Sequence, residues 1–246
     1  MTADRRVALV TGGASGIGLA TCRRLVADGF LLAVGDLDEG GAADAAGPDG
    51  YAAVLDVADE PSVDGFVAAA VATFGRIDVL VNNAGISGDR TATVLHSTPV
   101  AEWDRVIAVN VRGPFLLSRA VLPVMVAQGS GHVITIASVA GQVAFPGRSA
   151  YTTSKGAALQ LARSIAVDYA ASGIRSNAVC PGMAHTAMTS WRLDVPELRE
   201  QIEARIPLGR VASPDDVADL VSVLASDRLH YLTGAALVID GGYTTL

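Results

Sequence analysis

The sequence Val7-Ala8-Leu9-Val10 runs directly into Thr11-Gly12-Gly13-Ala14-Ser15-Gly16-Ile17-Gly18, and an amphipathic stretch follows from Leu19. The first four residues are apolar without alternation, which is typical of a strand covered on both faces of a parallel sheet. The glycines allow a sharp turn and a close backbone approach before a helix begins. This strand, loop and helix predict an α/β fold that opens with a βαβ unit.

The alternation of short apolar runs with longer helical stretches continues along the chain. Helical crossovers of this length are what parallel strands require. We therefore predict a Rossmann-type, doubly wound α/β fold with a seven-stranded parallel sheet flanked by helices on both faces, as a single domain over residues 1–246. The predicted strands are residues 7–10, 31–35, 52–55, 79–81, 133–136, 175–179 and 236–239.

Glycine and proline limit two of the predicted helices. Residues 61–74 stop at Gly75, which is suited to a left-handed C-terminal cap. Residues 100–128 contain Pro114 and Pro123, and we expect breaks or kinks near both prolines.

Two further stretches depart from the strand and helix pattern. Residues 40–50 are rich in glycine, alanine and proline and are predicted to be a surface connection. Residues 183–207 hold several large apolar side chains and form a predicted substrate lobe. This lobe is either a lid over a site or a packed pair of helices, and its place after the sixth strand favours the lid.

The glycine loop and the residues after the next strands predict a dinucleotide site, because sheets of this type bind ligands at the C-terminal ends of their strands. Asp36 ends the second strand, where its carboxylate can accept hydrogen bonds from adenosine ribose hydroxyls. Its charge would repel a 2′-phosphate, so NAD(H) is predicted rather than NADP(H). The alternatives are a glycine turn without a ligand, and an Asp36 that only caps a turn with Asp38. The predicted contacts here are Gly12, Ser15, Gly16, Ile17, Gly18, Asp36, Leu37, Asp56, Val57, Asn83, Ala84 and Gly85.

Tyr151 and Lys155 lie four residues apart on a predicted helix and therefore share a face. A nearby ammonium favours the phenolate and lowers the pKa of a tyrosine, which is ordinarily about 10, so that the phenol can act as a general acid/base. Ser138 follows the fifth strand and can donate a hydrogen bond to a substrate oxygen. Asn110 can complete a water-mediated relay from Lys155. Taken alone, the pair of Tyr151 and Lys155 is also typical of a surface contact, and Ser138 alone is typical of a helix cap.

Together these motifs resemble the short-chain dehydrogenase/reductase family in its single-domain form, over essentially the whole chain. Residues 11–18 resemble its TGxxxGxG loop, residues 82–85 its NNAG motif, and Pro181-Gly182 with Thr186 its PGxxxT segment. Asn110, Ser138, Tyr151 and Lys155 resemble its catalytic tetrad.

The resemblance implies a role for each tetrad residue. Tyr151 is the acid/base and Ser138 orients the substrate. Lys155 binds the nicotinamide ribose and lowers the Tyr151 pKa, and Asn110 supports the relay. It also implies a homotetramer built on the helices that carry Asn110 and Tyr151. The cofactor contacts that it implies at the nicotinamide end are Tyr151, Lys155, Pro181, Gly182, Met183 and Thr186.

The substrate pocket is expected between residues 86–95, 139–148 and 183–193, and its lining is expected to be mainly apolar. Arg148 is either a partner for an anionic substrate group or a solvated arginine. The side chains expected there are Val143, Phe145, Met183, Met188 and Trp191, beside His96 and Arg148.

Three functions fit these features. The first is NAD(H)-dependent interconversion of a secondary alcohol and its ketone. The second is reduction of 3-oxoacyl thioesters on an acyl carrier protein, but reductases of that kind favour NADP(H), and Asp36 argues against it. The third is a catalytically idle dinucleotide-binding sensor or scaffold, which would have no need of a phenol tuned by a lysine.

The composition limits the classes of partner and the compartment that we expect for this protein. The chain is 50% hydrophobic and 17% charged, which favours a compact protein that also buries subunit interfaces. The net charge of −7, without a Lys/Arg run, argues against nucleic-acid and anionic-membrane partners. Cys22 and Cys180 have no disulfide-framework or metal-ligand spacing, and no signal peptide is evident, so a metal-free cytoplasmic protein is expected.

Overall fold

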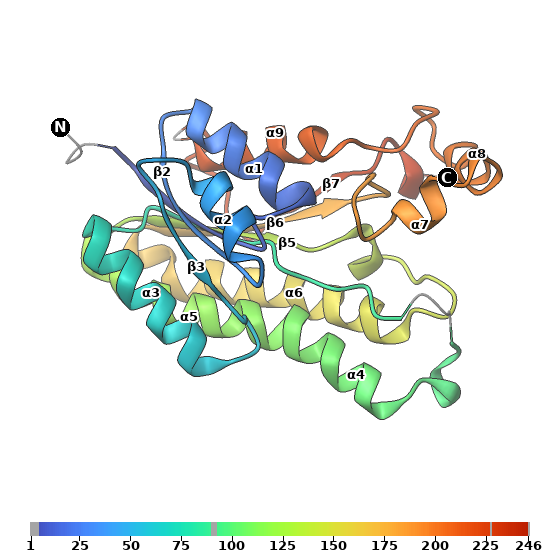
Figure 1. Cartoon of the computed structure of the whole chain (residues 1–246), viewed down its shortest axis with the longest axis horizontal. Helices are drawn as coiled ribbons and strands as arrows, with labels where there is room; N and C mark the ends of the chain where they lie inside the picture. Colours follow the sequence, from blue (N-terminus) through green and yellow to red (C-terminus); the bar gives the residue numbers. More distant parts are fainter. Residues whose placement is uncertain (1–4, 90–92, 227, 246) are drawn as a thin grey trace.

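The computed structural model describes residues 5–89, 93–226 and 228–245. Its centre is one seven-stranded, all-parallel sheet in the order β3-β2-β1-β4-β5-β6-β7, which confirms the predicted α/β class and Rossmann-type topology (Figure 1). The strands are β1 (Val7–Thr11), β2 (Leu31–Asp36), β3 (Tyr51–Val54), β4 (Val79–Asn82), β5 (Gly131–Ile136), β6 (Ile174–Pro181) and β7 (Ala236–Ile239).

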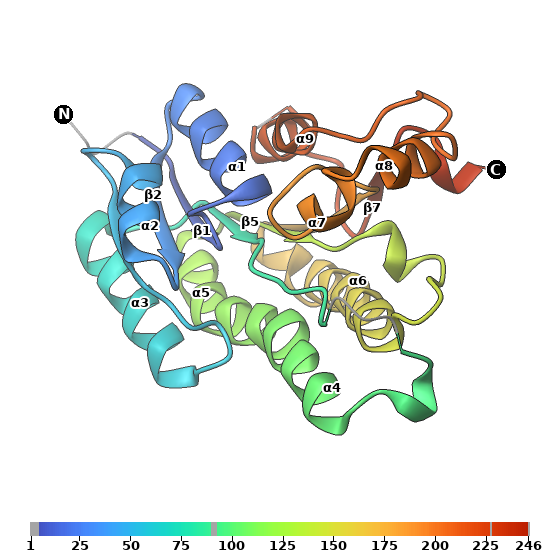
Figure 2. The same cartoon turned by 45° about the vertical axis from the view of Figure 1, so that its right-hand side comes forward.

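Helices cover both faces of this sheet, with α1, α2 and α9 on one side and α3, α5 and α6 on the other (Figures 1 and 2). The apolar run of β1 serves both layers, because Ala8 and Val10 pack with α1 and α9 whereas Leu9 packs with α3 and α5. The helices are α1 (Gly16–Ala27), α2 (Glu39–Ala46), α3 (Glu60–Phe74), α4 (Val100–Ile107), α5 (Gly113–Gln128), α6 (Ser149–Tyr169), α7 (Ser190–Leu193), α8 (Pro196–Glu203) and α9 (Pro214–Ala225).

The segment predicted as a surface connection at residues 40–50 contains most of the helix α2, so that prediction was wrong. Asp38 caps this helix by accepting a hydrogen bond from the Gly41 N–H at 3.1 Å. A Cβ on Gly41 would lie 2.7 Å from the Asp38 carboxylate, which explains why a weak helix former stands there. The helix is held by alanines that are buried against the sheet.

The run from residue 100 to 128 breaks at one place only. A π-helical turn (Ala108–Arg112) separates α4 from α5, and Pro114 occupies the first turn of α5, where a missing N–H costs little. The expected break near Pro123 was wrong, because α5 continues through this residue. By length and composition the whole run could cross a membrane. Half of its 18-residue apolar stretch is buried inside the protein, however, as in a core helix.

The predicted lobe at residues 183–207 contains the helices α7 and α8, which pack against each other. Its small apolar cluster is built on Leu193, Ile206 and Val211, and Met183 packs against it. The pair lies beside the C-terminal end of the chain, at the edge of the sheet where β6 and β7 end (Figure 2).

Candidate active site

A cavity of about 360 Å³ lies at the C-terminal ends of β1, β2, β4, β5 and β6. All predicted site residues line it except Asn110 and Met183. Met183 instead packs in the lobe cluster, and Ala184 and Met188 from the lobe line the cavity. The predicted residues in its wall are Gly12, Ser15, Gly16, Ile17, Gly18, Asp36, Leu37, Asp56, Val57, Asn83, Ala84, Gly85, Ser138, Tyr151, Lys155, Pro181, Gly182 and Thr186.

The glycine loop leaves the start of α1 open to this cavity. Gly12 and Gly16 have φ angles of 65° and 53°, which favour glycine, and a Cβ on Gly18 would lie 2.0 Å from the Gly12 carbonyl oxygen. The side chain of the N-cap residue Ser15 makes no capping hydrogen bond, and the first turn of α1 carries no acidic residue. The free N–H groups of this turn therefore fit a pyrophosphate.

Asn83 braces the loop from the neighbouring strand. Its Nδ2 donates to the carbonyl oxygens of Thr11 and Gly12, both at 2.9 Å. The backbone N–H groups of Asn83 and Ala84 both donate to the Thr11 hydroxyl at 3.1 Å. Thr11 was not among the predicted site residues, although its position at the end of β1 made it a candidate.

Asp36 makes the turn contact with Asp38 and also lies in the wall of the cavity. One carboxylate oxygen accepts from the Ala14 N–H at 2.9 Å, and the other accepts from the Asp38 N–H at 3.1 Å. The residue therefore supports a turn with Asp38 and also lines the cavity. Each carboxylate oxygen accepts more than one hydrogen bond, so a ribose hydroxyl can still be bound.

Ser138 and Tyr151 form a pair of hydroxyls in the cavity wall. Burial raises the pKa of Tyr151, and a hydrogen bond with Ser138 lowers it in part. Ser138 also accepts from the Ala140 N–H at 3.1 Å, so it is a cap as well as a member of the site. Its hydroxyl lies 3.4 Å from the carbonyl oxygen of Pro181 at the end of β6.

Lys155 is buried below this pair, with its Nζ 5.7 Å from the centroid of the Tyr151 ring. The ammonium donates to the Ile136 carbonyl at 2.8 Å, and burial lowers the pKa of Lys155 to about 8. Burial raises the pKa of Tyr151 and the contact that lowers it comes from Ser138, so a lowering of this pKa by Lys155 stays a prediction.

Asn110 occupies the π-helical turn, which places its buried amide behind the cavity. Its Nδ2 donates to the Ile86 carbonyl at 2.8 Å and to the Ser154 hydroxyl at 3.0 Å, and its Oδ1 accepts from the Ile86 N–H at 2.8 Å. A Cβ on Gly85 would lie 3.3 Å from the Asn110 Oδ1 and 3.5 Å from the Lys155 Nζ. The side chains of Asn110 and Lys155 therefore both lie close to Gly85.

Two arginines stand at the substrate side. Arg148 lines a small hollow of about 120 Å³ together with Tyr151, and it donates to the Asp89 carbonyl. Burial lowers the pKa of Arg148, and the positive charge of Arg192 in α7 lowers it further. The Arg192 guanidinium lies 5.4 Å from the centroid of the Trp191 ring. Arg192 was not predicted, since only the fold brings it near Arg148; residues 90–92 of the predicted pocket lie outside the described part of the chain.

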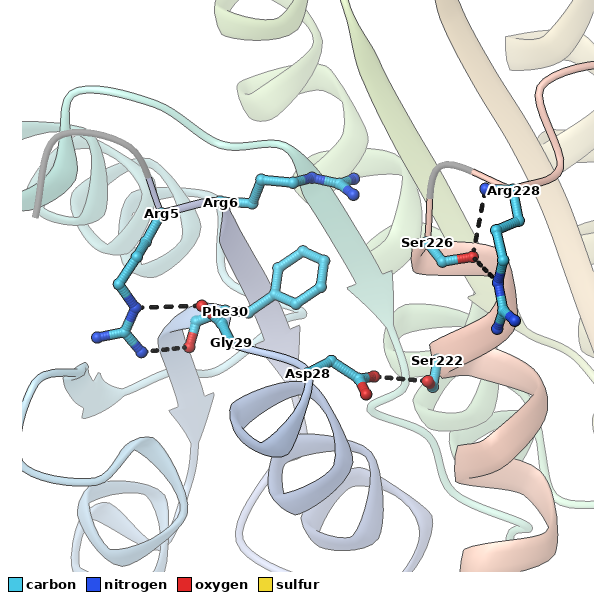
Figure 3. Close-up of a pocket in the computed structure, with 8 residues that line it drawn as sticks. All are labelled: Arg5, Arg6, Asp28, Gly29, Phe30, Ser222, Ser226 and Arg228. Atoms are coloured by element: carbon cyan, nitrogen blue, oxygen red, sulfur yellow. Dashed lines mark hydrogen bonds between the residues drawn. The ribbon is translucent and has the colours of Figure 1, made fainter.

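A larger cavity of about 450 Å³ lies at the opposite end of the strands, where β1 begins (Figure 3). There Arg5 donates to the carbonyl oxygens of Gly29 and Phe30, each at 3.1 Å. Asp28 accepts a hydrogen bond from Ser222 of α9 at 2.5 Å. These contacts join structural elements, and the predicted reacting groups lie at the other edge of the sheet.

Comparison with known proteins gives full-length relatives. The family model described as Enoyl-(Acyl carrier protein) reductase matches residues 12–244. A 2-(R)-hydroxypropyl-CoM dehydrogenase of Xanthobacter autotrophicus (strain ATCC BAA-1158 / Py2) is 56% identical over 98% of this chain and 99% of that protein. A cis-4-hydroxycyclohexanecarboxylate dehydrogenase of Sinomonas cyclohexanicum is 43% identical over 98% and 97% of the two chains.

A solved structure points the same way. The crystal structure of levodione reductase superimposes with a TM-score of 0.90 at 38% identity, over 98% of each chain. The motifs, the strand order and these relatives agree along the whole length. The chain belongs to the short-chain dehydrogenase/reductase family of oxidoreductases, which implies a nicotinamide dinucleotide cofactor.

Proposed function

We propose that this protein interconverts a secondary alcohol and its ketone by hydride transfer with NAD(H), with Tyr151 as the general acid/base. The observation that carries the proposal is the hydroxyl pair of Ser138 and Tyr151, with Lys155 buried beneath it, in the wall of the cavity that the glycine loop also lines. A protein that only sensed or displayed a dinucleotide would have no use for this arrangement.

The bound cofactor supplies the hydride acceptor for oxidation. Ser138 donates a hydrogen bond to the substrate oxygen, and the Tyr151 phenolate takes the hydroxyl proton as the C–H bond is broken. Lys155, whose pKa is about 8, then exchanges that proton with solvent, and Asn110 holds the neighbouring backbone in place. In the reverse direction, the phenol returns the proton to the ketone oxygen.

Asp36 supports NAD(H) over NADP(H). It lies in the cavity wall at the end of β2, and the adjacent Leu37 and the loop residue Ser15 carry no positive charge to bind a 2′-phosphate. A 2′-phosphate beside this carboxylate would therefore be repelled. We expect kcat/KM to be higher with NAD⁺ than with NADP⁺ for the same alcohol.

The substrate that we propose is a secondary alcohol with an anionic group. Arg148 shares a hollow with Tyr151 and Glu102. The positive charge of Arg192 in α7 lowers the pKa of Arg148, whereas the charge of Glu102 raises it. An anion between the two arginines would offset the repulsion of their charges. The names of the two dehydrogenase relatives describe secondary alcohols, a hydroxycyclohexanecarboxylate in one and a hydroxypropyl-CoM in the other.

The experiment is a turnover assay by NADH absorbance with 2-hydroxypropyl-CoM, 4-hydroxycyclohexanecarboxylate and butan-2-ol, each with NAD⁺ and NADP⁺. Oxidation of the anionic alcohols with NAD⁺ is the expected result. Tyr151→Phe should lower kcat by about 10²–10⁴-fold and leave NADH binding intact. Full turnover in this variant would exclude Tyr151 as the acid/base. Faster NADPH oxidation with acetoacetyl thioesters would instead establish the 3-oxoacyl reductase.

The proposal includes a cytoplasmic homotetramer that contacts through the faces of α5 and α6. Phe115 of α5 and Val167 of α6 are large apolar side chains that are 49% and 79% exposed, as residues of a subunit interface would be in one chain. Cys22 and Cys180 are both buried free thiols, which suits a reducing compartment. Sedimentation velocity measures the assembly directly.

A further inference from the structure

Three side chains from distant parts of the sequence form a stack beside the substrate lobe. The ring centroids of Phe145 and Tyr243 are 6.1 Å apart with an interplanar angle of 13°. The Arg205 guanidinium lies 5.0 Å from the centroid of the Tyr243 ring. Stacked rings and cation–π contacts both stabilise such an arrangement. Tyr243, near the C-terminal end, therefore joins Arg205 of the lobe to the loop between Ser138 and Tyr151.

The turn that carries Tyr243 is fixed by its own hydrogen bonds. The Asp240 carboxylate accepts from the N–H groups of Gly242 and Thr244, both at 2.8 Å, and from the Thr244 hydroxyl at 2.7 Å. Gly242 has a φ of 89°, and a Cβ there would lie 2.9 Å from the Pro207 side chain. The Tyr243 ring is thus presented from a rigid base that touches the lobe.

Phe145, the other ring of the stack, is joined to Arg148 by a backbone hydrogen bond. The Arg148 N–H donates to the Phe145 carbonyl at 3.3 Å, and Gly147 lies between them with a φ of 67°. The Gly147 carbonyl in turn accepts from the Thr93 N–H at 3.3 Å. Since this is a tight turn, a displacement of the Phe145 ring would shift the position from which Arg148 extends.

Tyr243 also reaches the segment that carries the second arginine. It packs against the cluster of Leu193, Ile206 and Val211, and Leu193 directly follows Arg192 in α7. One aromatic side chain therefore contacts both structural units from which the two arginines project.

We infer that Tyr243 is a positioning residue that sets the separation of Arg148 and Arg192 and so determines the affinity for the anionic group of the substrate. The inference rests on the proposed function. Tyr243 acts through Phe145 and the lobe cluster and does not line the cavity that holds the reacting groups. Its loss should therefore weaken the binding of the anionic group and leave the chemistry of the hydroxyl unchanged.

The test compares KM and kcat for 2-hydroxypropyl-CoM and for butan-2-ol. Tyr243→Ala should raise KM for the anionic alcohol about tenfold, which corresponds to about 1.4 kcal/mol. Its kcat, and both constants for butan-2-ol, should stay within about twofold of the unmodified enzyme. Tyr243→Phe keeps the ring and should restore KM. Tyr231→Ala removes a fully exposed tyrosine from the segment before β7 and is the matched control.

A double-mutant cycle tests the path of the effect. If part of the effect of Tyr243 passes through Phe145, the loss of both rings should raise KM by clearly less than the product of the two single effects. Arg205→Ala alters only the exposed end of the stack and should raise KM two- to threefold. This variant provides the test if Tyr243→Ala does not fold.

Two results would overturn the inference, and they are distinguishable. Equal losses with the anionic and the neutral alcohol would show that Tyr243 only supports the fold, while the proposed function stands. If the unmodified enzyme does not favour the anionic alcohol, the proposed anion site is disproved, and the proposed role of Tyr243 is disproved with it.

Discussion

At the scale of single residues, the protonation of Tyr151 is set by two opposing effects. Burial raises its pKa, and the hydrogen bond with Ser138 lowers it. In the proposed mechanism, alcohol oxidation needs the phenolate, so its rate rises as the pH rises through this pKa. Ketone reduction needs the phenol, and its rate falls over the same range. We expect oxidation to be fastest on the alkaline side.

Replacement of Ser138 by alanine should move this pH profile. The variant loses the contact that lowers the Tyr151 pKa, so the rise of kcat for oxidation should shift to higher pH, and kcat should fall by about 10²-fold because the substrate oxygen loses a donor. Ser138→Thr keeps the hydroxyl and should restore the profile. NADH formation followed from about pH 8 to about pH 11, a range that extends above the ordinary tyrosine pKa, measures the shift. An unchanged profile in the alanine variant would show that Ser138 does not set the protonation of Tyr151.

At the scale of secondary-structure elements, the π-helical turn is joined to α6 by one buried hydroxyl. Ser154 accepts a hydrogen bond from the Asn110 amide at 3.0 Å and donates to the Tyr151 carbonyl at 2.7 Å. π-helical turns are rare and often occur at functional sites. This turn places Asn110 where it meets Lys155 across Gly85.

Ser154→Ala should therefore weaken both the fold and the catalysis. Loss of this buried hydrogen-bond partner should lower the free energy of unfolding by about 1–3 kcal/mol. It should also lower kcat while KM for NAD⁺ stays constant, because the cofactor loop is not touched. Thr153→Ala, at an exposed position of the same helix, is the control for both measurements. A variant with reduced stability and normal kcat would show that the bond has no part in catalysis.

The same element shows where sequence reasoning stopped. The parallel strands and the glycine loop follow from local patterns, because buried parallel strands and tight glycine turns have strong local signatures. The π-helical turn has no such signature, and the prolines suggested a break at Pro123 that does not occur. The proximity of Arg148 and Arg192 was also beyond the sequence, because tertiary packing across the lobe creates it.

At the scale of the whole molecule, a buried histidine links the middle of the sheet to its C-terminal part. His132 of β5 lies 2.9 Å from the Leu224 carbonyl at one ring nitrogen and 2.9 Å from the Asn177 amide at the other. Asn177 in turn bonds the backbone of Leu232 and Ala235, just before β7. Burial is the largest cause that lowers the pKa of His132, to about 3.

This histidine should make the protein sensitive to acid. The unfolded chain takes up a proton below its ordinary pKa of 6.5, whereas the folded chain does so only near 3, so stability falls as the pH falls between these values. The loss should reach about 3 kcal/mol at about pH 4. Urea unfolding at a fixed protein concentration measures it. His132→Asn should flatten the pH dependence, while His230→Asn, at an exposed position, should leave it intact. Equal slopes in all three proteins would assign the effect to other groups.

Asp36 limits how the protein can change its cofactor in the course of evolution or engineering. The carboxylate that we propose repels a 2′-phosphate also ties the glycine loop to β2 through the Ala14 N–H. A single substitution that removes the charge therefore also loosens the cradle in which any dinucleotide must lie. A shift toward NADP(H) needs at least two changes here, one to admit the phosphate and one to secure the loop again. The first of them alone leaves a poorer enzyme for either cofactor.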